Sequence, residues 1–127
     1  METISVIRPK KILVVDDDEP TRIGMSHILS KEGYHVDSFS NGYEALSFLS
    51  QEEVDLVITD INMPEMNGIV FLKALAVSNP NINVIMITGY GKAESYIESI
   101  NHGAYDYLTK PVNILDLLAL LKKILSE

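Results

Sequence analysis

Short apolar runs rich in β-branched residues alternate along this chain with longer segments in which apolar residues recur at helical spacing. Several of the runs are apolar nearly throughout, as is typical of strands in a parallel sheet covered on both faces. The runs predict strands at residues 11–15, 35–39, 55–59, 83–87 and 105–108. Five strand-then-helix units predict an α/β fold, a three-layer sandwich with helices on both faces of a five-stranded parallel sheet and right-handed crossovers.

The segments between the runs carry helix start and stop signals. Acidic residues before Pro20 and the amide of Asn41 suit helix starts, while Gly33 and Gly103 suit helix ends, Gly103 in a left-handed conformation. The apolar residues expected to share a face are Thr21, Met25, Ile28 and Leu29 in the first helix, Ala45, Leu46 and Leu49 in the second, Val70, Phe71, Leu72 and Leu75, facing inward, in the third, and Ala93, Tyr96, Ile97 and Ile100 in the fourth.

The last predicted helix, from about residue 113 to 125, has an unusually wide apolar face. At about 100° per residue its leucines and isoleucines span roughly 220° of arc, more than one sheet face requires. We therefore expect Leu117, Leu120 and Ile124 to lie at the edge of the buried face, where they would serve a partner or a homodimer. Simple burial at the helix edge remains an equal alternative.

Length, charge and composition narrow the class of protein. The chain has 127 residues, of which 46% are hydrophobic, and this predicts a single domain over residues 11–127 after a flexible leader at 1–10. A net charge of −8 argues against direct binding to nucleic acid. There is no cysteine, no secretory signal pattern and no apolar run near the roughly 20 residues that span a bilayer. We expect a cytoplasmic protein without membrane contact.

Polar side chains collect where the predicted strands end. The sequence "VVDDDEP" puts Asp16 and Asp17 after the first strand, Asp60 follows the third, Thr88 the fourth, and Lys110 lies just past the fifth. Because the carboxyl ends of parallel strands share one edge of a sheet, these side chains should lie close together. Any one aspartate could be a turn former or a helix cap, and Asp18 is expected to be such a helix-start acid. Their shared position favours a site.

Carboxylates delivered by different strands form an oxygen site suited to Mg²⁺ (or Mn²⁺), which would offset the repulsion within the acidic run. A lysine and a threonine beside such a cation suit a phosphoryl group, one as a charge and one as a hydrogen-bond donor. An aspartate beside the metal can itself be the nucleophile and form an aspartyl phosphate. The residues alone thus indicate metal-dependent phosphoryl chemistry.

Four stretches, "ILVVDDDEP", "DLVITDINMPEMNG", "VIMITGYG" and "GAYDYLTKP", resemble the receiver domains of two-component response regulators over about residues 10–125. The resemblance implies a flavodoxin-like sheet of strand order 2-1-3-4-5. It also implies roles for individual residues: Asp60 as phosphoacceptor, Asp17 as direct Mg²⁺ ligand, Asp16 as ligand through water, the main-chain carbonyl of Asn62 as third metal contact, Lys110 and Thr88 as contacts of the phosphoryl group, and Tyr107 as aromatic switch.

The same resemblance implies a signalling domain that catalyses its own phosphorylation and dephosphorylation, rather than an enzyme with turnover. A sensor histidine kinase or phosphotransfer protein would donate the phosphoryl group from a phosphohistidine, and the fourth helix, fifth strand and fifth helix would signal to an output domain or partner. The family also implies a cis Lys110–Pro111 bond, a loop shaped by Pro64 and Gly68, a phosphoryl lifetime tuned by Asn62 and Tyr90, and kinase contacts at Arg22, Ile23, Ser26, Val112 and Asn113.

The sequence leaves two other functional interpretations open. "ILVVDDD" also resembles the signature of haloacid-dehalogenase-like phosphatases, with Asp16 as nucleophile and Asp18 as acid/base, although "ITGYGKAE" lacks the second acidic pair of that family and Asp60 would have no role. The second interpretation is a receiver domain that only docks partners and is not phosphorylated. Stand-alone action and excision from a larger regulator are equally compatible with the sequence.

Overall fold

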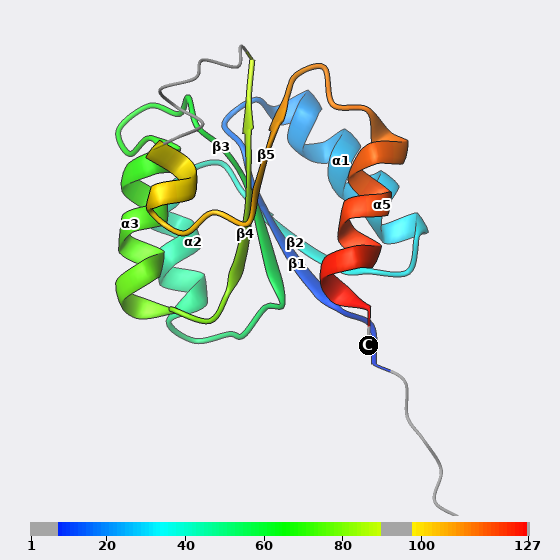
Figure 1. Ribbon diagram of the computed structural model, residues 1–127, viewed down its shortest axis with the longest axis horizontal. Helices are drawn as coiled ribbons and strands as arrows, with labels where there is room; N and C mark the ends of the chain where they lie inside the picture. Colours follow the sequence, from blue (N-terminus) through cyan, green and yellow to red (C-terminus); the bar gives the residue numbers. More distant parts are fainter. Residues whose placement is uncertain (1–7, 90–97, 127) are drawn as a thin grey trace, which may run out of the picture.

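The computed structural model describes residues 8–89 and 98–126 and shows one parallel sheet between two layers of helices (Figure 1). The strand order is β2-β1-β3-β4-β5, as the family resemblance implied. The strands are β1 (Lys11–Val15), β2 (His35–Phe39), β3 (Leu56–Asp60), β4 (Asn83–Thr88) and β5 (Asp106–Thr109). The predicted α/β sandwich and its topology are confirmed.

The helices divide between the two faces of the sheet. Helices α1 (Glu19–Lys31) and α5 (Ile114–Leu125) cover one face, and α2 (Gly42–Leu49) and α3 (Gly68–Ser78) cover the other (Figure 1). Residues 98–101 are also helical and lie on the side of α3. Within the described ranges, no helix is both long and apolar enough to cross a bilayer.

Each face of the sheet has its own hydrophobic cluster. Leu13, Val57 and Met86 face α2 and α3 and pack with Phe71 and Leu75, all at most 1% exposed. Neighbouring strand positions face the opposite way, so Ile12, Ile58 and Ile85 pack with residues of α1 and α5 such as Leu29 and Leu121. Burial on both faces explains why the central strands are apolar nearly throughout.

Side-chain caps explain where the helices begin. The side chains of Asp18, Asn41, Asn67 and Asn113 accept backbone N–H bonds at the starts of α1, α2, α3 and α5. Such caps satisfy amides that have no partner within the helix. The predicted roles of Asp18 and Asn41 as helix-start residues are confirmed, and Gly33 and Gly103 adopt φ values of 99° and 100° after helix ends.

Predictions about the burial of two side chains and about the bounds of three strands were wrong. Val70 does not face inward but is 47% exposed, because Phe71, Leu72 and Leu75 already occupy the buried side of α3. Leu117 does not lie at the edge of α5 but is fully buried, whereas Leu120 and Ile124 are half-buried at the margin of the cluster. Strands β3 and β5 each lie one residue later than predicted, and β4 is one residue longer, ending at Thr88.

The prediction of a fourth helix falls mostly outside the described residues. Ala93, Tyr96 and Ile97 belong to that part of the chain, and so does Tyr90. Of the residues expected on one face of this helix, Ile100 is described and is 37% exposed, while its neighbour Ser99 is fully buried.

Candidate functional site

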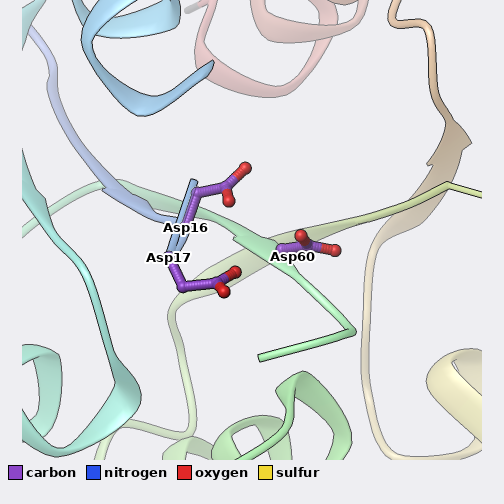
Figure 2. Close-up of side chains that lie close together, drawn as sticks. All are labelled: Asp16, Asp17 and Asp60. Carbon is purple, nitrogen blue, oxygen red and sulfur yellow. The ribbon is translucent and has the colours of Figure 1, made fainter. Parts of the chain in front are cut away.

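Three carboxylates meet at the carboxyl ends of β1 and β3. The two strands are adjacent and in parallel register, with Val15 paired to Thr59, so the residues that follow these positions emerge side by side. Asp16, Asp17 and Asp60 each offer one oxygen within 4.8 Å of the others (Figure 2). The geometric expectation from the strand ends therefore holds for all three acids.

Hydrogen bonds hold the segment that carries the first two acids. The Asp16 amide donates to the carbonyl of Phe39 on β2 at 3.1 Å, and its carboxylate Oδ1 accepts from the Asp18 amide at 2.9 Å. Asp18 itself turns toward α1, where its carboxylate accepts from the amide and the hydroxyl of Thr21. These bonds hold the pKa of the Asp18 carboxyl below its usual value. Three consecutive aspartates thus have separate surroundings.

Lys110 brings one positive charge to the acids. Its Nζ lies 2.9 Å from Asp60 Oδ2 and 3.5 Å from Asp16 Oδ2. Its amide donates to the Thr88 carbonyl at 2.6 Å, and the following Lys110–Pro111 bond is cis, as the resemblance implied. Burial alone would lower the pKa of Lys110, but the hydrogen bond to Asp60 and the charges of both acids outweigh it, so the pKa is raised.

The acidic cluster carries more negative charge than Lys110 balances. Asp16 and Asp60 are 5% and 6% exposed, whereas Asp17 is open to solvent. Burial is the largest cause that raises the pKa of the Asp16 carboxyl, and the charges of Asp60 and Asp17 add to it. Taken by themselves, these three carboxylates, when ionised, and the Lys110 ammonium sum to a net charge of −2. Such a site suits a divalent cation with a preference for oxygen ligands.

Thr88 and Asn62 lie beside the acids. Asn62 follows Asp60 by two residues, and its amide donates to Asp60 Oδ1 at 3.2 Å. Its side-chain Nδ2 lies 3.4 Å from Thr88 Oγ1, so the end of β4 is linked to the loop after β3. Thr88 is 3% exposed at the last position of β4. The structure thus gathers the acids, Lys110, Thr88 and Asn62 at one edge of the sheet.

Tyr107 occupies a different position from these polar residues. It lies on β5 opposite Met86, two residues before Thr88 on the neighbouring strand. Its ring is partly buried against the hydrophobic cluster beneath α2 and α3, and its hydroxyl oxygen is shielded from solvent. Tyr107 therefore adjoins the polar site through β4.

The loop after Asp60 approaches the strand end closely at Gly68. A Cβ on Gly68 would lie 2.3 Å from the Asp60 carbonyl oxygen and 2.7 Å from the Ile61 Cα, both of them backbone atoms. The Gly68 amide donates to the Ile61 carbonyl at 2.7 Å, which closes the loop. Within the loop Glu65 has a φ of 68°, a conformation uncommon for a residue with a side chain. The prediction that Gly68 shapes this loop is confirmed.

One contact at the site was missed by sequence reasoning. Arg22, considered there only as a kinase contact, folds back from α1, and its Nη1 donates to the Asp16 carbonyl at 2.9 Å. The only sequence signal for it is an arginine four residues after the helix cap Asp18, which is close enough to reach the preceding loop.

Comparison with known proteins gives one consistent result. Residues 12–122 match the family model described as the response regulator receiver domain. The chain is 39% identical over 116 residues to sporulation initiation phosphotransferase F of Bacillus subtilis, covering 91% of this chain and 94% of that protein. It is also 39% identical to the transcriptional regulatory protein ZraR of Escherichia coli, but covers only 26% of that protein.

Solved structures agree with the sequence comparison. A CheY-like response regulator receiver domain protein from Methanospirillum hungatei superposes with a TM-score of 0.88 at 37% identity, covering 91% of this chain and 93% of that one. The chemotaxis protein CheY4 of Vibrio cholerae gives a TM-score of 0.88 at 34% identity over 93% of this chain and all of that one. The similarity thus extends over nearly the whole length of three of these proteins and about a quarter of ZraR.

Proposed function

This chain belongs to the response regulator receiver domain family of two-component systems, whose members accept a phosphoryl group, and we propose that Asp60 is the residue that accepts it here. The observation that carries the assignment is the contact of Asp60 Oδ2 with Lys110 Nζ at 2.9 Å, inside a cluster of three carboxylates. Asp16 is equally buried, but its contact with the Lys110 ammonium is longer, 3.5 Å against 2.9 Å for Asp60.

The proposed donor is a phosphohistidine of a sensor histidine kinase or phosphotransfer protein. An Asp60 carboxylate oxygen attacks phosphorus, the new oxygen–phosphorus bond forms, and the phosphorus–nitrogen bond breaks with its electron pair returning to the imidazole. Lys110 offsets charge on the phosphoryl oxygens, so this chain acts by positioning and electrostatics. Water later attacks phosphorus, which releases phosphate and restores the carboxylate.

The donor set fits Mg²⁺, which the receiver family generally binds. Asp16, Asp17 and Asp60 would hold it together with the main-chain carbonyl of Asn62, and their excess negative charge over Lys110 matches a divalent ion. Bound there, the ion would supply charge neutralisation for the phosphoryl oxygens. The three carboxylates form this negatively charged site before the phosphoryl donor binds.

The proposed readout begins at Thr88. A phosphoryl group on Asp60 offers a new acceptor for the Thr88 hydroxyl, which would leave its place beside Asn62 Nδ2. Tyr107, one strand away and partly buried, would then repack, and the surface formed by residues 98–101, β5 and α5 would signal to a partner or output domain. The exposure of Leu115 at 77%, with Leu120 and Ile124 half-buried, supports a contact along α5.

A groove beside Lys110 supports the kinase as partner. It has a volume of about 310 Å³, lies between α1 and the start of α5, and is lined by Met25, Ile28, Pro111 and Val112 among others. Ile23, on the same helix, is 57% exposed. A helix of the donor seated here would bring its phosphohistidine close to Asp60. The phosphatase alternative loses support, since Asp18 caps α1 instead of facing the other acids.

The test is chemical labelling of the purified chain. Incubation with acetyl phosphate and Mg²⁺ should add the mass of one phosphoryl group to the wild type and to Asp116→Asn, a control at an exposed carboxylate of α5, but not to Asp60→Asn. Absence of label on the wild type, or label that persists in Asp60→Asn, would overturn the assignment. Continuous release of phosphate from small phosphate esters would instead favour a phosphatase.

A further inference from the structure

Arg22 makes a contact that the phosphoryl chemistry does not use. Its side chain is 15% exposed, and it turns back from the first turns of α1 toward the β1–α1 loop. Nη1 donates to the Asp16 carbonyl at 2.9 Å, while Nη2 lies 3.7 Å from the carboxylate of Glu19. A guanidinium held from two sides and largely shielded from water is a stronger hydrogen-bond donor than a mobile surface cation.

The accepting carbonyl belongs to the peptide unit that joins Asp16 to Asp17. The Asp16 amide donates to the Phe39 carbonyl, and the Asp16 carboxylate accepts from the Asp18 amide. The bond from Arg22 fixes the Asp16 carbonyl, the remaining backbone group of this residue. Because the carbonyl lies in the plane of the Asp16–Asp17 peptide, the bond also fixes the orientation of that plane. The direction in which the exposed Asp17 side chain leaves the loop therefore depends on Arg22.

We propose that Arg22 is a positioning residue for the divalent cation, holding Asp17 in the orientation that the cation requires. The inference rests on the proposed function, because it concerns the ion assigned to the Asp16, Asp17 and Asp60 cluster. Hydrogen-bond partners behind metal ligands commonly change metal affinity about 10- to 100-fold when removed. Arg22 acts in this way through the backbone.

Because Arg22 is charged, the direction in which its neutralisation changes Mg²⁺ affinity distinguishes two possible roles. A guanidinium close to the acids repels a second cation, so if Arg22 acted only through its charge, its neutralisation would tighten Mg²⁺ binding. If Arg22 holds the peptide, the same neutralisation weakens Mg²⁺ binding. The two roles thus predict opposite changes in one dissociation constant.

The experiment compares Arg22→Met, which keeps length but removes donor and charge, with Arg22→Gln, which keeps a donor without charge, and Arg22→Lys. Arg8→Met removes the same charge from an exposed site at the opposite end of the sheet and serves as control. Mg²⁺ affinity is measured without any phosphoryl donor, from amide NMR shifts of Asp17 and Asn62. We expect the dissociation constant of Arg22→Met to rise about tenfold, with partial recovery in Arg22→Gln and Arg22→Lys and no increase in Arg8→Met.

Unchanged or tighter Mg²⁺ binding in both Arg22→Met and Arg22→Gln overturns the proposal. Urea unfolding of each variant identifies a general loss of fold, and Arg22→Gln provides the comparison if Arg22→Met does not fold. With acetyl phosphate, the half-saturating Mg²⁺ concentration should rise while the rate at saturating Mg²⁺ stays near the wild-type value. A variant impaired only with the kinase would show a docking role and overturn the proposal.

The outcome is separable from that of the proposed function. If the wild type binds Mg²⁺ but is not labelled at Asp60, the phosphoacceptor assignment fails, while the affinities of the Arg22 variants still decide the positioning role.

Discussion

The Lys110 ammonium and the Asp60 carboxylate lie 2.9 Å apart although 50 residues separate them in sequence. The contact spans the sheet from the end of β5 to the end of β3, across β4. It joins one cation to an acidic cluster that it only partly neutralises. The reactivity expected of Asp60 and the pH dependence expected of the fold both depend on this imbalance of charge.

Replacement of Lys110 by Met should slow phosphoryl transfer to Asp60 while the fold is retained. Loss of one preorganised donor to developing negative charge commonly costs about 10²- to 10³-fold in rate. The measurement is the initial rate of labelling by acetyl phosphate at saturating Mg²⁺. Lys122→Met, at an exposed position of α5, should label at the wild-type rate. Equal rates for the two variants would contradict the role of Lys110.

The raised pKa of Asp16 predicts a specific pH dependence of stability without Mg²⁺. Because the folded state binds this proton more tightly than the unfolded state, the free energy of unfolding gains a contribution as pH falls through the folded pKa. That gain is complete below the unfolded pKa. Asp16→Asn should lack it and should be more stable than the wild type near pH 7. Urea unfolding at a series of pH values, in EDTA, measures the difference, and a wild type that is more stable than Asp16→Asn at pH 7 would refute it.

Gly68→Ala should destabilise the domain and disturb the phosphoacceptor. The new methyl group would collide with the Asp60 carbonyl and the Ile61 Cα, and overpacking of this kind costs about 1–3 kcal/mol. Gly24→Ala is the matched control, since a Cβ there meets no atom within 4 Å and lies within α1. Alanine should stabilise that helix by about 0.5–1 kcal/mol. Urea unfolding should give changes of opposite sign.

Thr88→Ala should separate phosphorylation from signalling. The acids and Lys110 remain, so beryllofluoride, a mimic of the phosphoryl group, should still bind with Mg²⁺. The Tyr107 ring should then shift less in NMR spectra than in the wild type, because the hydroxyl that would leave Asn62 is absent. Thr88→Ser, which retains the hydroxyl, should restore the shift. A full Tyr107 response in Thr88→Ala would remove Thr88 from the switch.

The two sides of α5 should respond differently to truncation. Leu117 is fully buried, and its replacement by Ala should lower the free energy of unfolding by about 2–5 kcal/mol. Leu115 is 77% exposed, and its replacement should change stability by less than about 0.5 kcal/mol.

Leu120→Lys, at the half-buried edge of α5, tests self-association by sedimentation at high concentration. An unchanged association state would remove Leu120 from any dimer contact.

The sequence predicted most of the fold because strand signals in a parallel sheet are local and strong. The apolar runs predict the strands that end near Asp60 and Thr88, but place each end one residue too early. Both residues continue the backbone pairing, Asp60 with Ile87 and Thr88 with Thr109, and this pairing depends on neighbours distant in sequence.

The incorrect predictions of which helix residues are buried also result from contacts between segments distant in sequence. In α5 nearly every turn offers leucine, so periodicity could not determine that Leu117 faces the sheet and Leu115 faces away. In α3 the adjacent Val70 and Phe71 are both apolar, and only packing against the sheet decides which one is buried. The contact of Arg22 with the Asp16 carbonyl has only a weak sequence signal, the spacing of Arg22 from the cap Asp18, because a backbone acceptor is not encoded by residue type.

The sheet separates two independent hydrophobic clusters, one beneath α2 and α3 and the other beneath α1 and α5. Tyr107 belongs to the first cluster, while Met25, at the groove proposed for the kinase, belongs to the second. A substitution that changes a side chain of one cluster therefore alters packing contacts of that cluster first. A change in the packing around Tyr107 is thus separated by the sheet from the side chains beneath α1 and α5, which form the groove and the buried side of α5.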